Sequence, residues 1–247
     1  MRTTQNTILI TGGSAGIGLA IAKSFSEKGN QVIITGRSAE RLQQAVAKLK
    51  NTTAIQCDVT SEEDVDKLVA TIKKDFPQLN VLINNAGNAF YYQQGIGANA
   101  VDKAREEIVT NYLAPISLTE KLLPVLQEQK EAAVVNVTSI VAFAPNKGMA
   151  TYGASKAALH SYSLSLRLAL EPTSIKVFEL MPPLVDTEFS SVIGGAVNGI
   201  PPSEVADALL TAFEANEYQI HVGRTAQIYA LSLSSPAEAL AAMNQRR

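Results

Sequence analysis

The sequence predicts an α/β fold with a doubly wound, mostly parallel seven-stranded sheet and helices on both faces. Short runs rich in β-branched residues alternate with amphipathic stretches along the whole chain, which is the pattern of repeated strand–helix units. Most of the short runs are apolar throughout, as strands covered on both faces should be. No linker, repeat or charge block divides residues 1–247, so we expect a single domain.

Seven runs are the expected strands. Between them, Thr60 with Glu63 resembles a capping box that opens a helix, and Gly29 stands where a glycine should end the first helix. Ser235, Pro236 and Glu238 indicate one more helix start near the end of the chain. The expected strands cover Thr7–Thr11, Gln31–Thr35, Thr53–Cys57, Val81–Asn84, Ala133–Thr138, Ile175–Leu180 and Tyr218–Val222.

Composition excludes several classes of protein. The chain has 247 residues, 46% apolar and 18% charged, which is enough for an ordinary hydrophobic core. Lys+Arg number 21 against 23 Asp+Glu, so the basic excess of a nucleic-acid binder is missing. Cys57 is the only cysteine and there are two histidines. We therefore expect no internal disulfide and no metal site.

The first residues, MRTTQNTILITGG, contain no long apolar segment and no small-residue cleavage site. No apolar run in the chain approaches the ~18 residues that a membrane helix requires. We expect neither a signal peptide nor contact with a membrane. A cytoplasmic location is the corresponding prediction.

A glycine-rich turn follows the first expected strand directly. The segment TGGSAGIG, residues 11–18, has the spacing G-x3-G-x-G and leads into a helical stretch. Glycines let the backbone approach a pyrophosphate, and the helix N-terminus offers unpaired N–H groups to it. The segment predicts a Rossmann fold that binds a dinucleotide. Its candidate cofactor-binding residues are Gly12, Ser14, Gly16, Ile17 and Gly18.

The second expected strand ends in Thr35-Gly36-Arg37-Ser38. Enzymes that use NAD often place an acidic side chain here, on the ribose 2′-hydroxyl. A carboxylate would repel a 2′-phosphate, whereas a guanidinium binds it with charge-assisted hydrogen bonds. Arg37 therefore favours NADP(H) over NAD(H), although it could also be a solvated surface residue. Ser38 is expected to cap the next helix and could also contact the phosphate.

Two further strand ends are expected at the same edge of the sheet. The third strand ends in Cys57-Asp58-Val59, and Asp58 could accept a hydrogen bond from an adenine amino group or be an ordinary loop residue. The fourth strand leads into Asn85, Ala86 and Gly87, whose small side chains leave room for a ribose or a flat ring. Ligands bind at the carboxyl edge in this architecture.

Tyr152 and Lys156 form the motif YGASK in a stretch that reads as a helix. Residues i and i+4 share a helix face, so the lysine can lie beside the phenol. A nearby ammonium, together with an oxidised nicotinamide, could lower the tyrosine pKa from ~10 towards neutrality, where a general acid–base works best. Ser139, at the end of the fifth strand, would orient the substrate oxygen or would merely cap the strand.

Asn111 lies in an otherwise regular helical stretch, four residues before Pro115. Because proline has no N–H, the Asn111 carbonyl loses its usual partner and the helix should kink there. A water is the expected replacement donor, and it could connect Lys156 to solvent. An ordinary proline kink without function is the alternative.

The segments TGGSAGIG, NNAG and YGASK, with Asn111 and Ser139 in the same order, resemble the short-chain dehydrogenase/reductase family in its ~250-residue single-domain branch. The resemblance covers nearly the whole chain. It implies that Asn111, Ser139, Tyr152 and Lys156 form a catalytic tetrad, and that Tyr152 and Lys156 also bind the cofactor. It further implies that Pro182, Val185 and Thr187 contact the nicotinamide carboxamide and a phosphate.

Two features depart from the family pattern. Pro182-Pro183 stands where Pro-Gly is usual, which stiffens the backbone and removes a donor. The C-terminal segment lacks the usual glycine-rich ending, so a homodimer is favoured over the tetramer that is common in the family.

Residues 184–203 are the expected substrate lid, because three glycines in it allow movement. The resulting prediction is hydride transfer between NADPH and a ketone or aldehyde, with Tyr152 as general acid; the reverse reaction oxidises an alcohol. The alternative is a redox-sensing scaffold that binds NADP(H) without turnover. Histidines 160 and 221 are expected to be packing or surface residues. The expected pocket residues are Phe90, Tyr91, Tyr92, Ile140, Val141, Phe143, Met149, Phe189, Val192, Ile193 and Val197.

Overall fold

The computed structural model describes residues 1–245. Its centre is one seven-stranded sheet with the order β3-β2-β1-β4-β5-β6-β7. All of the neighbouring pairs are parallel, which confirms the predicted fold class and sharpens "mostly parallel" to "all parallel". The strands are β1 Thr7–Thr11, β2 Gln31–Gly36, β3 Thr52–Gln56, β4 Val81–Asn84, β5 Ala132–Val137, β6 Ile175–Met181 and β7 Gln219–His221.

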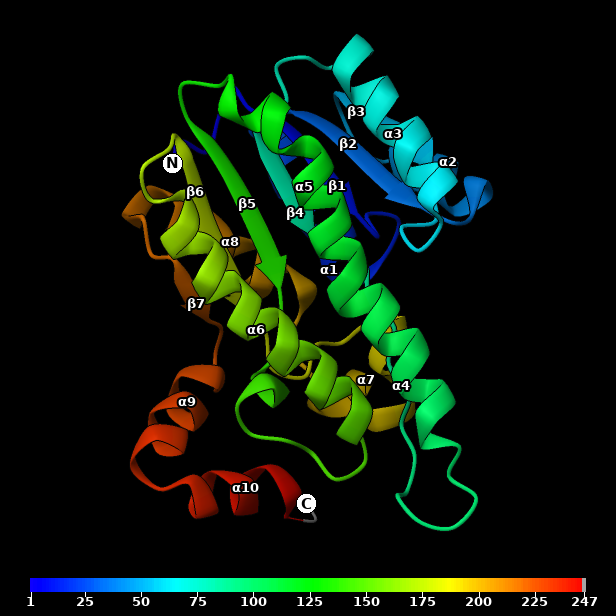
Figure 1. The fold of residues 1–247 in the computed structure, drawn as a ribbon, viewed down its shortest axis with the longest axis vertical. Coiled ribbons are helices and arrows are strands. Elements are labelled where there is room, and N and C mark those ends of the chain that lie inside the picture. Colours follow the sequence, from blue (N-terminus) through cyan, green and yellow to red (C-terminus); the bar gives the residue numbers. More distant parts are fainter. Residues whose placement is uncertain (246–247) are drawn as a thin grey trace.

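Helices cover both faces of this sheet and extend beyond its carboxyl edge (Figure 1). The long helices are α1 Gly16–Glu27, α2 Ala39–Val46, α3 Glu62–Asp75, α4 Ala100–Ile108, α5 Ala114–Gln127, α6 Ala150–Leu170, α8 Pro202–Ala215, α9 Thr225–Ser234 and α10 Pro236–Asn244. The short ones are η1 Val109–Leu113, η2 Ile140–Ala142, η3 Glu188–Ile193 and α7 Gly195–Asn198. Among the described residues, no helix is both long enough and apolar enough to cross a membrane.

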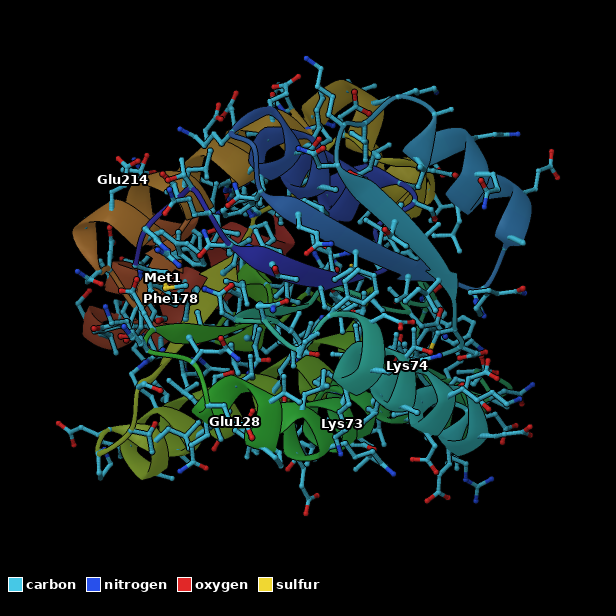
Figure 2. All side chains as sticks on the ribbon, turned by 90° about the horizontal axis from the view of Figure 1, so that it is seen from above. Met1, Lys73, Lys74, Glu128, Phe178 and Glu214 are labelled. Carbon is cyan, nitrogen blue, oxygen red and sulfur yellow. The ribbon has the colours of Figure 1, made fainter. Side chains whose placement is uncertain are left out.

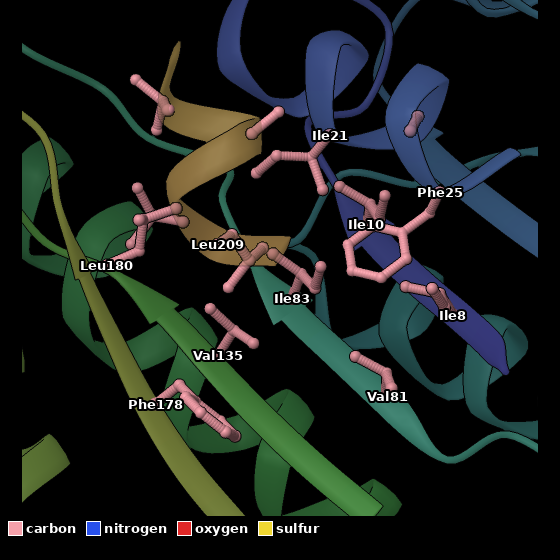
Figure 3. Packing of buried hydrophobic residues seen from close by; sticks show 14 of the residues in the cluster. Ile8, Ile10, Ile21, Phe25, Val81, Ile83, Val135, Phe178, Leu180 and Leu209 are labelled. Carbon is pink, nitrogen blue, oxygen red and sulfur yellow. The ribbon is translucent and has the colours of Figure 1, made fainter. Parts of the chain in front are cut away.

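Alternating strand residues build two hydrophobic layers. On one face, Ile8 and Ile10 of β1 pack with Phe25 of α1 and Leu209 of α8, and Figure 3 shows this cluster from close by. On the other face, Leu9 packs with residues of α3 and α5. Side chains successive along a strand point to opposite faces, so an apolar strand feeds both layers.

The polar surface surrounds these layers. Figure 2 shows the side chains of Lys73, Lys74 and Glu128 pointing outward, whereas Phe178 lies inside the molecule. Phe178 is completely buried. This division is the usual result of burying apolar surface while leaving charges in water.

One predicted helix start is wrong by one residue. The N-cap of α3 is Ser61, whose hydroxyl accepts from Asp64 N at 3.3 Å. The hydroxyl of Thr60 is already engaged, since both its N–H and its Oγ1 donate to Asp58 Oδ1. The capping prediction failed because two adjacent hydroxyl residues competed for one position.

The predicted kink near Asn111 is a π-helical turn instead. Residues Val109–Leu113 form this turn between α4 and α5, and Ala114 N bonds to Val109 O. Pro115 therefore lies in the first turn of α5, which begins at Ala114, and its missing N–H costs no helical hydrogen bond there. A widened turn places the Asn111 side chain differently from a simple kink.

Candidate active site

One large cavity lies at the carboxyl edge of the sheet and has a volume of about 910 Å³. The loops that follow β1, β4, β5 and β6 line it, and α10 closes one side. Twelve of the predicted site residues line this cavity: Gly12, Gly16, Ile17, Asn85, Ala86, Gly87, Ser139, Tyr152, Lys156, Pro182, Val185 and Thr187. The others, Ser14, Gly18, Arg37, Ser38, Asp58, Val59 and Asn111, lie outside its lining.

The glycine-rich turn has the backbone that a phosphate cradle needs. Gly12 and Gly16 have φ of +66° and +54°, a backbone region that residues other than glycine rarely adopt. Gly18 has a packing role, because a Cβ there would lie 2.4 Å from Gly12 O. No side chain caps the N-terminus of α1. Its first N–H groups and its dipole therefore suit an anion such as a pyrophosphate.

Asn85 and Ala86 tie the fourth strand to this turn. Asn85 Nδ2 donates to the carbonyls of Thr11 and Gly12 at 2.9 and 3.1 Å. The backbone N–H groups of Asn85 and Ala86 both donate to Thr11 Oγ1 at 3.0 Å. Asn85 thus holds the shape of the cradle, and Thr11 has a role that the sequence analysis missed.

The basic residues after β2 divide between surface and cavity. Arg37 is exposed and outside the cavity lining. Ser38 caps α2 as predicted, accepting from Arg41 N at 3.3 Å. Arg41 lines the cavity and pairs with Glu188 at 2.5 Å. The sequence analysis missed Arg41, because its place at the cavity goes with a contact to Glu188, 147 positions further along the chain.

Asp58 and Val59 are close to the cavity without lining it. The Asp58 carboxylate accepts from Thr60, and its N–H donates to Asp64 Oδ2 at 2.9 Å. Val59 borders a much smaller neighbouring cavity together with Thr11 and Ala86.

Tyr152 and Ser139 both line the large cavity, and their side chains share a hydrogen bond. Tyr152 is only 8% exposed, and burial raises the pKa of its phenol. A hydrogen bond with the Ser139 side chain opposes this rise, and the Glu107 carboxylate adds to it. Desolvation is thus the largest influence on the phenol, and the lowering of its pKa expected from Lys156 together with an oxidised nicotinamide stays a prediction.

Lys156 accompanies Tyr152 on the same face of α6. Its Nζ lies 5.7 Å from the centroid of the tyrosine ring and donates to Val137 O at 2.8 Å. Burial lowers the pKa of Lys156 to about 8, because a low dielectric disfavours the ammonium. Lysine and tyrosine are thus both desolvated groups that lie within one helical turn of each other.

The Asn111 side chain makes three hydrogen bonds, while the water expected on its carbonyl stays a prediction. Its Oδ1 accepts from Asn88 N, and its Nδ2 donates to Asn88 O, both at 2.8 Å. Nδ2 also donates to Ser155 Oγ at 2.9 Å. Asn111 is fully buried behind the cavity, and it connects the loop after β4 to helix α6.

A buried acid, Glu107, supports the same loop one turn earlier. Its Oε1 accepts from Phe90 N at 2.7 Å, and burial raises the pKa of this carboxyl. An isolated Glu in a helical stretch gives no sequence signal of such a role. The role of Glu107 depends on the loop at Phe90, which lies 17 positions earlier in the chain.

The predicted lid contains η3 and α7. Val185 and Ile200 pair as a parallel bridge at its base. Thr187 lies against the glycine turn, since a Cβ on Gly16 would be 3.1 Å from Thr187 Cγ2. The Phe189 ring lies 6.2 Å from the Tyr152 ring. The segment therefore spans both the cradle and the reacting groups.

Seven of the expected pocket residues line the cavity: Tyr91, Ile140, Val141, Met149, Phe189, Val192 and Ile193. Phe90 and Tyr92 instead contact Lys103, and Phe143 packs on Tyr229. Val197 is exposed and outside the lining. The sequence analysis missed Asn146, Arg224, Ala242, Met243 and Gln245, which line the end of the cavity near α10.

The two histidines lie outside the cavity lining. His221 packs against the ring of Tyr229, with the centroids 4.3 Å apart. His160 bonds to the buried Glu179. Among the described residues, no group of three or more His, Cys, Asp or Glu side chains could hold a metal ion.

Comparison with known proteins gives consistent results. The model of the short chain dehydrogenase family matches residues 6–196. The uncharacterized oxidoreductase DltE of Bacillus subtilis is 48% identical over 76% of this chain and 74% of its own. The NADP-dependent 3-hydroxy acid dehydrogenase YdfG of Salmonella typhi is 36% identical over 75% of each chain.

A solved short chain dehydrogenase from Burkholderia cenocepacia, in complex with NADP, superposes with a TM-score of 0.86. It is 28% identical and covers 98% of each chain. A likeness to the oxidoreductase encoded with lipoteichoic-acid D-alanylation is also predicted, and the match to DltE confirms it. The segments that together carry this prediction are LITGGSAGIGL, CDVT, KAALHSYSLSLR and MPPLVDT. By the family match and by these relatives, the chain belongs to the short chain dehydrogenase family and is an oxidoreductase.

Proposed function

We propose that this protein transfers hydride between NADPH and a ketone or aldehyde, with Tyr152 as the general acid. The observation that carries the proposal is one continuous cavity. It joins an uncapped helix N-terminus and its glycine turn to the buried Tyr152, Ser139 and Lys156. A nucleotide laid along the cradle would therefore end beside the reacting side chains.

The residues present fit a dinucleotide. Gly12, Gly16 and Ile17 form the pyrophosphate cradle, and the loop 85–87 borders the ribose region. Tyr152, Lys156, Pro182, Val185 and Thr187 would surround the nicotinamide end. All of these residues line the cavity.

A preference for NADP(H) over NAD(H) is supported by two arginines. Arg37 follows β2 directly, where an acidic residue would favour NAD. Arg41 lines the cavity one helical turn later. Both guanidinium groups are suited to a 2′-phosphate. The relative YdfG is named NADP-dependent, and the superposed Burkholderia structure contains NADP.

Bound NADPH would supply the hydride, and the side chains of this chain would control the proton. Tyr152 holds a neutral hydroxyl, because burial raises its pKa, and it is placed to protonate the carbonyl oxygen. Ser139 bonds to Tyr152 and would orient that oxygen. The positive charge of Lys156 would stabilise the tyrosinate that remains.

The walls of the substrate end favour a largely apolar carbonyl compound. Ile140, Val141, Met149, Phe189 and Ile193 contribute carbon surface to the cavity, and residues 184–203 are the lid in this proposal. YdfG is named for 3-hydroxy acids, so 3-keto acids belong in the substrate panel as well.

The test is NADPH oxidation across aldehydes, ketones and 3-keto acids, with NADH in parallel. Turnover that favours NADPH supports the proposal. Tight NADPH binding without turnover on any compound supports instead a redox-sensing scaffold. A stronger response to NADH would contradict the role of the two arginines.

We also propose a homodimer. The C-terminal helix α10 packs on its own chain, where Asn244 Nδ2 donates to Pro145 O and Asn146 Nδ2 donates to Met243 O, both at 2.9 Å. The family's usual glycine-rich ending is missing from this segment. Light scattering during size-exclusion chromatography should give the mass of two chains of 26.3 kDa; four would contradict the proposal.

A further inference from the structure

A buried acid and a histidine lie beside the end of strand β5, outside the cavity. Glu179 of β6 is fully buried. Both of its carboxylate oxygens lie 2.9 Å from His160 Nδ1. A carboxylate only accepts hydrogen bonds, so the Nδ1–H of the imidazole is the donor. The His160 side chain is itself only 19% exposed.

The same carboxylate holds the residue that precedes Ser139. Thr138 Oγ1 donates to Glu179 Oε1 at 2.6 Å. Thr138 borders the cavity but is only 1% exposed, so the protein supplies the partner of its hydroxyl. Glu179 therefore fixes the side chain of Thr138 directly beside the candidate catalytic serine.

Three consecutive residues at the end of β5 thus make three different links. Val137 O accepts from Lys156 Nζ, Thr138 bonds to Glu179, and Ser139 bonds to Tyr152. His160 follows Lys156 by one turn of α6 and Tyr152 by two turns. The pair therefore joins β5 to the helix that carries the other two reacting groups.

Other charged groups near the pair do not replace it. Arg167 of α6 donates to Val177 O and acts on His160 only through its charge. His221 of β7 interacts with both members of the pair through charge, and Glu217 acts through charge on His221. Glu179 remains the partner that raises the pKa of His160.

A contribution to stability alone does not explain why the His160–Glu179 pair is buried. Burying a carboxylate and an imidazole costs solvation that apolar side chains of similar size would avoid. A buried pair of this kind is best explained by its holding the residues around it in one arrangement. The geometry that it specifies here is that of residues 137–139 against α6.

We propose that the His160–Glu179 pair is a positioning device for the reaction, because it holds the end of β5 so that Ser139 and Lys156 are aligned with Tyr152. This inference rests on the proposed function and goes beyond it by assigning a role to two residues outside the cavity.

The first experiment compares Thr138→Val, Glu179→Gln and His160→Gln with the wild type on the best carbonyl substrate. Thr138→Val keeps the shape of the side chain and removes one donor, so it also serves if Glu179→Gln fails to fold. We expect kcat to fall about tenfold or more in each variant, since small displacements of reacting groups are costly. The Kd for NADPH should stay within about twofold of wild type.

Ser163→Ala is the matched control. Ser163 is fully buried on the same helix, accepts from Asn136 Nδ2 at 2.9 Å and donates to Leu159 O at 2.7 Å, so its hydrogen bonds go to residues other than 137–139. Its loss should lower the melting temperature without lowering kcat. Variants of the pair that keep wild-type kcat, or lose no more than Ser163→Ala, would overturn the proposal.

A second readout does not depend on turnover. The pKa of Lys156 is measured by NMR on protein with ¹³C-labelled lysine, where a value of about 8 separates it from surface lysines. Thr138→Val and Glu179→Gln should lower it, by weakening the bond from Nζ to Val137 O. An unchanged pKa would overturn the positioning role. If the wild type reduced no carbonyl compound, the proposed function would fail while this measurement still decided the inference.

Discussion

The Tyr152 hydroxyl is surrounded almost entirely by protein, and this sets what it can do. Burial disfavours the tyrosinate, so the neutral phenol is available as a proton donor across the physiological range. Donation becomes favourable only when positive charge lies close enough to stabilise the anion that is left. Lys156 is the nearest candidate on the same helix face.

Replacing Tyr152 with Phe should therefore abolish most of the turnover. A general acid contributes about a hundredfold to ten-thousandfold to the rate, so kcat should fall by that factor while the Kd for NADPH stays unchanged. Stopped-flow oxidation of NADPH and fluorescence titration measure the two quantities. Tyr92→Phe is the control, because its hydroxyl bonds to Thr151 outside the cavity lining.

The lowered pKa of Lys156 predicts an alkaline loss of activity. Its ammonium becomes neutral as the pH rises through about 8, so kcat/KM for carbonyl reduction should fall there. Arginine keeps its charge, so in Lys156→Arg this decline should move to higher pH. An identical decline in that variant would assign the titration to another group.

The same group makes a signed contribution to stability. Between a pKa of about 8 in the folded chain and the ordinary 10.5 in the unfolded chain, the unfolded state binds more protons. This lysine therefore makes the free energy of unfolding rise with pH in that interval. Below pH 8, burial of the charged ammonium lowers the free energy of unfolding. The proposed function requires this charge.

Arg37 and Arg41 should make the protein bind NADPH more tightly than NADH. Arg37→Gln and Arg41→Gln are expected to raise the Kd for NADPH about tenfold, since one charge-assisted hydrogen bond is worth ~1.5 kcal/mol or more. The Kd for NADH should not change. Arg105→Gln is the control, as it removes an exposed guanidinium from α4. Equal weakening of both nucleotides would contradict a contact with the 2′-phosphate.

At the scale of elements, the strand ends explain why candidate site residues far apart in the chain converge. β1, β4, β5 and β6 are parallel neighbours in the sheet, so their carboxyl ends lie along one edge. The glycine turn, the loop 85–87, Ser139 and Pro182 follow these four strands. Each is placed by the register of the sheet rather than by local preference.

Replacing Gly18 tests how closely the glycine turn is packed. In Gly18→Ala, the new Cβ would lie 2.4 Å from Gly12 O and 2.5 Å from Asn85 Nδ2. Because one of these atoms belongs to the backbone, the cradle must shift, and we expect NADPH binding to weaken at least tenfold. Calorimetric titration measures the loss.

Gly29→Ala is its control. Gly29 ends α1 with a φ of +81°, and a Cβ added there would meet no other atom within 4 Å. The change should cost about 1 kcal/mol of stability through backbone strain. NADPH binding should remain as in wild type, and a loss equal to that of Gly18→Ala would point to general destabilisation.

Periodicity predicted the elements well where one physical signal dominated. Apolar β-branched runs located all seven strands with ends shifted by no more than two residues, and Ser38 and Gly29 marked helix ends correctly. Prediction failed where choices competed or partners were distant. Thr60 and Ser61 competed for one cap, and the π turn at Asn111 depends on the loop at Asn88 that it binds.

The site followed the same rule. Motif residues could be placed because their spacing reports a local geometry, as in YGASK on one face of α6. Arg41, Glu107 and the residues of α10 carry no such spacing, because their roles come from contacts across 17 to 147 positions of sequence. Burial, which opposes the lowering expected for the Tyr152 pKa, is likewise a property of the folded chain.

In the whole molecule, the two ends of the chain have different tasks. In the proposed function the segment from β1 to β4 holds the nucleotide, whereas α9 and α10 lie beyond the carboxyl edge of the sheet (Figure 1), where we propose the substrate end. α9 and α10 pack with η2 and the start of α6 in a separate apolar cluster around Met149 and Tyr152. The last helix therefore shapes the cavity without touching the cradle.

Ala242→Phe tests whether α10 affects substrate binding without affecting NADPH binding. Ala242 lines the cavity, so a phenyl ring there would occupy substrate volume. The KM for bulky ketones should rise about tenfold, a difference of ~1.4 kcal/mol, while small aldehydes and NADPH bind as before. Leu240→Phe, on an exposed position of the same helix, controls for the added ring. If both variants changed KM equally, or if NADPH binding weakened with Ala242→Phe, α10 would not be a wall of the substrate end alone.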